Sequence, residues 1–202
     1  MERMRLLYID DTPDVDLSRY LDSLDQQYSG QGYAFEYAEI PFDPQKDYGS
    51  LLNDVRVQSA NIIIIDSRLF ENKTATGGKF SGEEFKFVLQ KFYPYIEVLV
   101  ITQNEADAAV TMIPKYVMNA EQSGMDYYAQ VVPPYINKAI AQIKQYRILA
   151  SKINENDSWE TLLKEKVLGT LQGTQAYDEL TKQDIDSLIC AFREIKESIN
   201  GG

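Results

Sequence analysis

The sequence predicts an α/β protein with a doubly wound, five-stranded parallel sheet, followed by a C-terminal α-helical hairpin. Two observations lead to this fold class. Over residues 1–150, short apolar runs alternate with stretches that repeat apolar residues every three or four positions, as when helices connect parallel strands. Residues 151–202 show the helical spacing alone. We therefore expect an α/β domain over residues 1–150 and a helical extension over residues 151–202.

Uninterrupted apolar runs predict the strands at the centre of the sheet. Residues 6–9, 62–65 and 98–101 are apolar throughout, which suits parallel strands that are buried on both faces. A weaker strand is expected at residues 33–40, where aromatic side chains alternate with smaller or charged residues. A fifth strand is expected at residues 127–132, where two prolines would close it.

Helical periodicity fills the intervals between these runs, in residues 14–27, 48–58, 82–92, 105–120 and 135–153. Pro114 lies within the fourth of these stretches and is expected to kink or break that helix. Near the C-terminus, Asp157 and Thr181 each begin a capping pattern ahead of an apolar stripe. These patterns predict the two helices of the hairpin.

The composition excludes several classes of function. The chain has 202 residues with 20 Lys plus Arg against 31 Asp plus Glu, a net charge of -11, and this sign argues against a nucleic-acid partner. It contains no histidine and one cysteine, so histidine-based catalysis and cysteine-rich zinc sites are excluded. The apolar runs are too short for a signal peptide or a membrane span. We expect a soluble, cytoplasmic protein.

Acidic residues follow two of the predicted strands. Asp10 and Asp11 come directly after the first apolar run, and Asp66 follows the run at residues 62–65. Functional groups in an open parallel sheet gather at the carboxyl ends of the strands, so we expect these carboxylates to share one crevice. Clustered carboxylates repel each other unless a cation balances them, and a set of oxygen ligands favours Mg²⁺. The sequence therefore predicts a magnesium site.

With these residues, the chain resembles the flavodoxin-like receiver domain of two-component response regulators. The resemblance spans about residues 4–150. The matching elements are the acidic pair Asp10-Asp11, the lone Asp66, Thr102 after the next strand, the segment 81–85 that opens a helix, and a proline pair after the expected fifth strand.

The resemblance implies a role for each of these groups. Asp66 would accept a phosphoryl group from the phosphohistidine of a histidine kinase or phosphotransfer protein. Mg²⁺ would be held by the carboxylates of Asp10, Asp11 and Asp66 and by the backbone carbonyl of Arg68. Thr102 would act as a switch that hydrogen-bonds the new phosphate. In this family an aromatic residue on the fifth strand usually moves with that hydroxyl, and Tyr127 and Tyr128 are the candidates here.

The chain also departs from the receiver pattern. Receivers have a lysine immediately before the proline that follows the fifth strand, but the expected fifth strand here ends in Val131-Val132, directly before Pro133-Pro134, with no lysine. Lys115 lies far upstream of that position, and Lys138 lies in the following helix, so neither matches. The nearest possible substitutes are Arg68 and Lys79, which both follow Asp66. Residues 71–80 form a longer segment than receivers have there and are a candidate lid or partner contact.

The favoured function is that of an atypical response-regulator receiver, a phosphoacceptor rather than an enzyme, whose output is protein–protein contact. The missing lysine leaves open a pseudo-receiver that binds partners without phosphorylation. A metal-dependent phosphatase of the haloacid-dehalogenase type also uses aspartate nucleophiles, but it requires Asp-x-Asp where this chain has Asp10-Asp11-Thr12. The apolar stripe at residues 185–199 is expected either to dock on its own chain or to bind a second copy or an output partner.

Overall fold

The computed structural model describes residues 1–43, 46, 48–70, 81–103, 112–118, 122–156 and 161–172. Its strands are β1 (Glu2–Asp10), β2 (Tyr33–Pro41), β3 (Ile62–Asp66), β4 (Glu97–Thr102) and β5 (Met112–Pro114). Its helices are α1 (Val15–Asp22), α2 (Leu24–Ser29), α3 (Tyr48–Leu52), α4 (Val55–Ser59), α5 (Gly82–Phe92), α6 (Gly124–Val131), α7 (Pro133–Glu155) and α8 (Thr161–Gln172).

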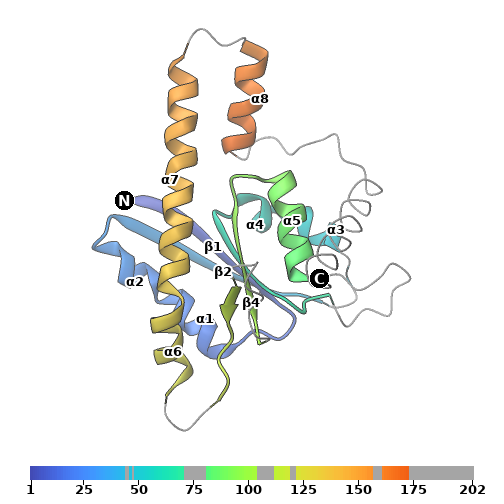
Figure 1. Ribbon diagram of the computed structural model, residues 1–202, viewed down its shortest axis with the longest axis vertical. Helices are drawn as coiled ribbons and strands as arrows, with labels where there is room; N and C mark the ends of the chain where they lie inside the picture. Colours follow the sequence, from blue (N-terminus) through green and yellow to red (C-terminus); the bar gives the residue numbers. More distant parts are fainter. Residues whose placement is uncertain are drawn as a thin grey trace, which may run out of the picture.

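The strands form one sheet in the order β2-β1-β3-β4-β5, and every neighbouring pair is parallel (Figure 1). The prediction of an α/β protein with a five-stranded parallel sheet is therefore confirmed. Because all five strands run the same way, the carboxyl ends of β1, β3 and β4 lie at one edge of the sheet. None of the described helices has the length and apolar character needed to cross a membrane.

Each face of the sheet buries its own apolar cluster. Alternate residues of a strand point to opposite faces, so Ile63 and Ile65 lie in one cluster, and Ile62 and Ile64 lie in the other. Residues of α3, α4 and α5 complete the first cluster. Residues of α1, α2, α6 and α7 complete the second. The apolar run of β3 is fully buried because both of its faces are covered.

The fifth strand lies elsewhere than the sequence predicted. Residues 127–132 are not a strand, since α6 covers most of them, and β5 is formed by Met112–Pro114 instead. The Ser123 side chain accepts a hydrogen bond from the Asp126 N–H and caps α6, and this local signal outweighs the β-propensity of the tyrosines and valines that follow.

The helix expected at residues 105–120 is also wrong for its described part, because residues 112–118 are not helical. Pro114 ends β5 at the edge of the sheet, where the missing N–H removes no bond to a further strand. The rest of that expected helix, residues 105–111 and 119–120, lies outside the described residues.

Other helices follow the predictions more closely. The stretches at 14–27 and 48–58 each form two short helices rather than one, and α7 extends the expected helix at 135–153 by a few residues at both ends. The first helix of the predicted hairpin corresponds to α8, which packs beside α7 (Figure 1). The second helix, including residues 185–199, lies outside the described residues. The domain division at residue 150 stays a prediction.

Gly82 opens α5 where the helix touches the end of β3. Its N–H donates to the Ser67 carbonyl at 2.8 Å, and an added Cβ would lie 2.4 Å from the backbone oxygen of Asp66 and 3.0 Å from the Cα of Ser67. A Cβ cannot fit here without moving backbone. Ser81 caps the same helix through a capping box with Glu84, so the helix start is fixed against the strand end.

We predict that Gly82→Ala lowers the free energy of unfolding by about 1–3 kcal/mol, because the new methyl group overlaps the backbone of β3. Denaturant titration followed by circular dichroism measures this change. The control is Gly30→Ala, where nothing lies within 4 Å and φ is -64°, so the change should stay within about 0.5 kcal/mol. Equal effects of the two substitutions would contradict the proposed close contact.

Candidate functional site

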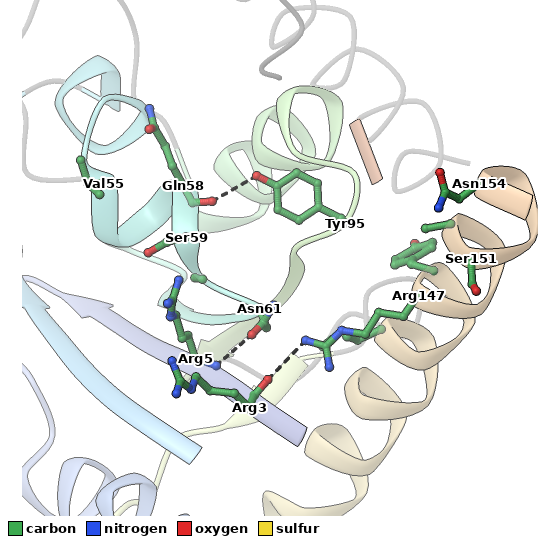
Figure 2. Close-up of a pocket in the computed structure, with 14 residues that line it drawn as sticks. Arg3, Arg5, Val55, Gln58, Ser59, Asn61, Tyr95, Arg147, Ser151 and Asn154 are labelled. Atoms are coloured by element: carbon green, nitrogen blue, oxygen red, sulfur yellow. Dashed lines mark hydrogen bonds between the residues drawn. The ribbon is translucent and has the colours of Figure 1, made fainter. Parts of the chain in front are cut away.

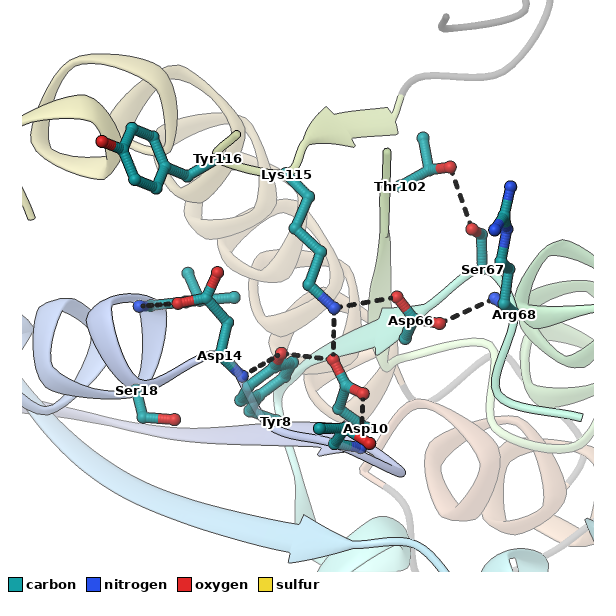
Figure 3. A network of polar contacts seen from close by, with 12 residues as sticks. Tyr8, Asp10, Asp14, Ser18, Asp66, Ser67, Arg68, Thr102, Lys115 and Tyr116 are labelled. Carbon is teal, nitrogen blue, oxygen red and sulfur yellow. Dashed lines mark hydrogen bonds and ion pairs between the residues drawn. The ribbon is translucent and has the colours of Figure 1, made fainter. Parts of the chain in front are cut away.

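Three charged side chains meet at the carboxyl edge of the sheet (Figure 3). Asp10 is the last residue of β1, Asp66 is the last residue of β3, and Lys115 directly follows β5. The Lys115 ammonium lies 2.9 Å from Oδ2 of Asp10 and 3.3 Å from Oδ1 of Asp66. One cation therefore links the two carboxylates that the sequence placed in a common crevice.

This ion pair is shielded from water. The side chains of Lys115, Asp10 and Asp66 are 14%, 1% and 11% exposed. Charges in such surroundings are costly unless they are paired and hydrogen-bonded, and removal of one partner leaves an uncompensated buried charge. Lys115 is therefore expected to hold the two strand ends together more firmly than an exposed salt bridge would.

Lys115 corrects the expectation that no lysine follows the fifth strand. That expectation depended on a strand at 127–132; with β5 at Met112–Pro114, a lysine follows the strand directly, although Tyr116 rather than proline comes next. Of the suggested substitutes, Arg68 has an exposed side chain, and Lys79 lies outside the described residues. The only sequence signal for Lys115 is a short apolar pair and a proline ahead of it.

Burial and neighbouring charges shift the pKa values of Asp66 and Lys115. Burial raises the pKa of the Asp66 carboxyl above its ordinary value, and the nearby Lys115 ammonium opposes that rise without cancelling it. Burial disfavours the charged form of Lys115, but the hydrogen bond to Asp10 and the charge of Asp66 raise its pKa overall. The lysine therefore stays protonated at neutral pH, and Asp66 has the perturbed titration that is common at functional sites.

Hydroxyl groups lie beside Asp66. The Ser67 hydroxyl donates to the hydroxyl oxygen of Thr102 at 2.9 Å, and both residues are buried. The Arg68 N–H donates to Oδ2 of Asp66 at 2.8 Å and so orients the carboxylate. Thr102, the predicted switch, is thus connected to the residue that follows Asp66. Ser67 was not predicted, because a serine after a strand has no distinctive pattern.

The buried side chain of Tyr8 is hydrogen-bonded to the carboxylate of Asp10. Tyr8 is fully buried and donates its hydroxyl hydrogen to Oδ2 of Asp10 at 2.5 Å, while the N–H of Asp14 donates to the Tyr8 oxygen at 3.3 Å. Burial together with the Asp10 charge raises the pKa of Tyr8, so the phenol remains a donor. The N–H of Thr12 donates to the other oxygen of Asp10 at 2.9 Å. Both oxygens of this carboxylate are therefore positioned by hydrogen bonds.

Tyr128 of α6 connects Asp14 to the residue that follows Lys115. Tyr128 donates its hydroxyl hydrogen to Oδ2 of Asp14 at 2.8 Å and accepts from the Tyr116 N–H at 3.0 Å. Tyr116 is the neighbour of Lys115, whose ammonium contacts Asp10. The groups form a closed circuit that connects the strand ends with α1 and α6.

The two candidate switch aromatics are placed differently from the prediction. Tyr127 and Tyr128 belong to α6 and not to the fifth strand. Tyr128 is fully buried within the circuit, and Tyr127 donates to the carbonyl of Pro114 at 3.2 Å. Both therefore contact the end of β5 or the segment that follows it, although they come from a helix.

The donor set for the expected Mg²⁺ is present only in part. Asp10 and Asp66 offer the carboxylate oxygens that a hard cation prefers, and half-buried Asp11 is next in the chain. Within the part of the chain that the structure describes, however, no three acidic, histidine or cysteine side chains are grouped closely enough to hold a metal ion. The oxygen chemistry fits Mg²⁺, but Lys115 has to share its two carboxylates with the ion.

Comparison with known proteins adds nothing to this geometry: no family model, curated protein or solved structure matches the chain.

We predict that Lys115→Met lowers the free energy of unfolding at pH 7 by about 3–5 kcal/mol, because two buried carboxylates lose their shared cation. Chemical denaturation at constant ionic strength gives the value. Lys152→Met, which removes an exposed lysine of α7, should change it by no more than about 0.5 kcal/mol. Equal free energies of unfolding for the two variants would show that the ion pair does not stabilise the fold.

The raised pKa of Asp66 gives a dependence on pH with a definite sign. The folded pKa lies above the ordinary value of 3.8, so folding takes up a proton between these two pH values, and stability falls as the pH rises through this interval. Asparagine cannot ionise. We therefore expect Asp66→Asn to be more stable than the unchanged chain at pH 7, with the difference vanishing below about pH 3.8. A difference that grew toward low pH, in paired denaturant titrations, would contradict this sign.

Proposed function

We propose that this chain is a receiver-type phosphoacceptor that takes a phosphoryl group on Asp66 and passes the signal on by protein contact. The observation that carries the proposal is the Lys115 ammonium between Asp10 and Asp66. In the family that the sequence resembles, a lysine after the fifth strand pairs with the phosphoryl group. We propose that Lys115, which directly follows β5, takes the part of that lysine here.

The order of the strands supports the same proposal. The order β2-β1-β3-β4-β5 is that of the flavodoxin-like arrangement. In such sheets the chain moves to one side after the first strand and to the other side after the second, and the crevice lies where the direction changes, between β1 and β3. Asp10 and Asp66 end these two strands. The position of these two residues supports the proposed phosphoacceptor, because ligands bind at that crevice in sheets of this class.

The proposed chemistry is transfer from a phosphohistidine of a histidine kinase or phosphotransfer protein. An Asp66 oxygen forms a bond to phosphorus while the bond between phosphorus and the imidazole nitrogen breaks, and the electron pair of the broken bond stays on nitrogen. Lys115 balances the negative charge that gathers at the site, and the Arg68 N–H holds the other Asp66 oxygen. Mg²⁺, held by Asp10, Asp11 and Asp66, would supply further neutralisation of the phosphoryl oxygens.

The hydroxyl pair and the circuit of hydrogen bonds offer a way to report the phosphate. A phosphoryl group on Asp66 would attract both the Lys115 ammonium and the nearby hydroxyls of Ser67 and Thr102. A shift of Lys115 would act on Tyr116 and through it on Tyr128 of α6. We propose that the output surface lies around α6 and the C-terminal helices, where a partner protein or a second copy would bind.

A second function is favoured by the same ion pair. In a pseudo-receiver, Lys115 would hold Asp10 and Asp66 together permanently, and the domain would bind its partner without phosphorylation. The burial of both carboxylates and the lack of a preformed cluster of three metal ligands among the described residues fit this alternative. The two functions differ in whether Asp66 can be modified.

Phosphorylation by a small donor distinguishes them. We predict that acetyl phosphate with Mg²⁺ adds one phosphoryl group, seen by intact-protein mass spectrometry, and that Asp66→Asn abolishes the addition. Lys115→Met should reduce it at least tenfold, because the charge at the site is no longer balanced. Asp16→Asn, which alters a half-exposed carboxylate of α1, is the matched control and should react normally. Modification of the Asp66→Asn protein, or none of the unchanged chain, would refute the phosphoacceptor function.

A further inference from the structure

Ser67, the residue after the proposed phosphoacceptor, is hydrogen-bonded through its backbone to two other elements. Its N–H donates to the carbonyl of Ile101 in β4 at 2.9 Å. Its carbonyl accepts from the N–H of Gly82, the first residue of α5, at 2.8 Å. These two bonds fix the backbone of Ser67 beside the end of β4 and the start of α5.

The side chain of Ser67 holds the hydroxyl of Thr102. The Ser67 hydroxyl donates to Oγ1 of Thr102 at 2.9 Å, and both residues are buried, so bulk water does not compete for this bond. A threonine side chain has three staggered positions about χ1, and this bond favours the one in which Oγ1 faces Ser67. The net contribution of one such hydrogen bond corresponds to about a fivefold preference.

The carboxylate of Asp66 is bound by other groups. Within the described part of the chain, it accepts hydrogen bonds from the Lys115 ammonium at 3.3 Å and from the Arg68 N–H at 2.8 Å. The hydroxyl of Thr102 points toward Ser67 instead (Figure 3). The hydroxyl that is proposed to bind the phosphoryl group is therefore engaged by Ser67 while Asp66 is unmodified.

The backbone of Thr102 is held as firmly as that of Ser67. Thr102 ends β4, which pairs with β5 on one side, and its carbonyl accepts from the Lys115 N–H at 2.7 Å. Because the strand end is fixed in this way, the Thr102 hydroxyl changes its partner by rotation about χ1 rather than by movement of the strand. Such a rotation breaks the bond to Ser67.

We propose that Ser67 is a positioning residue that holds the Thr102 hydroxyl away from Asp66 until a phosphoryl group is present. The oxygens of a phosphoryl group are charged acceptors, which bind a hydroxyl more strongly than a neutral partner does, so they take over the hydroxyl of Thr102. The hydroxyl of Ser67 thus opposes the modified state. Its hold on Thr102 is independent of the phosphoacceptor function, whereas its effect on the modified state rests on that function.

The rotamer of Thr102 tests the first part of the proposal in the full chain without a ligand. Three-bond NMR couplings from the Thr102 methyl carbon to the backbone nitrogen and carbonyl carbon report χ1. We expect the couplings of one rotamer in the unchanged chain and averaged couplings in Ser67→Ala, which lacks the hydroxyl. Ser67→Thr keeps a hydroxyl and should keep the single rotamer. An unchanged single rotamer in Ser67→Ala would overturn the proposal.

The affinity for beryllofluoride, a mimic of a phosphoryl group, tests the second part. An NMR titration at saturating Mg²⁺ gives the dissociation constant. We expect Ser67→Ala to bind about fivefold more tightly, because the ligand no longer competes with Ser67 for the Thr102 hydroxyl. In a Thr102→Val background, Ser67→Ala should change the affinity by less than about twofold, because Ser67 acts through that hydroxyl.

Ser59→Ala is the matched control. Ser59 lines a cavity at the amino ends of the strands, at the other edge of the sheet from Asp66 (Figure 2). Its hydroxyl donates to the Arg56 carbonyl at 3.5 Å. Removal of this hydroxyl should change neither the couplings of Thr102 nor the affinity for beryllofluoride.

The outcomes of the titration separate this proposal from the phosphoacceptor function. Equal affinity of Ser67→Ala and the unchanged chain would show that Ser67 does not restrain Thr102. Weaker binding by Ser67→Ala would show that the serine hydroxyl binds the ligand itself. Equal tightening in the Thr102→Val background would show that Ser67 acts through another group. Each of these results overturns the role of Ser67 alone, whereas no binding by the unchanged chain refutes the phosphoacceptor function together with the role of Ser67 in it.

Discussion

The buried pairing of one ammonium with two carboxylates is the constraint on which the carboxyl edge of this sheet depends. Asp10 and Asp66 end neighbouring strands, and their charges would repel each other without Lys115. The lysine directly follows β5, which lies on the other side of β4 from β3. Tyr8 and Tyr128 then connect the same charges to α1 and α6. The ion pair of Lys115 with Asp10 and Asp66 therefore joins the ends of β1 and β3 to the segment after β5 and sets the charge balance of the site.

Much of the fold could be predicted because its central strands are apolar on both faces. The runs at 62–65 and 98–101 lie within β3 and β4, and the acidic residues after the first and third strands were placed at the right edge. β5 could not be found this way, because it is a three-residue edge strand that ends in a proline and its position depends on pairing with β4. Missing that strand also meant missing Lys115, since a lysine in a loop has no pattern of its own.

The central claim is that Lys115 and Asp66 form a site competent for a phosphoryl group rather than a permanently closed ion pair. The most direct measurement is the NMR spectrum of the chain with Mg²⁺, before and after addition of beryllofluoride, which mimics a phosphoryl group on a carboxylate. The account predicts that signals of Ser67, Thr102, Lys115 and Tyr116 shift, and that Asp66→Asn abolishes the shifts. Unchanged spectra at saturating Mg²⁺ and beryllofluoride would contradict it and leave the constitutive binding module as the function of this fold.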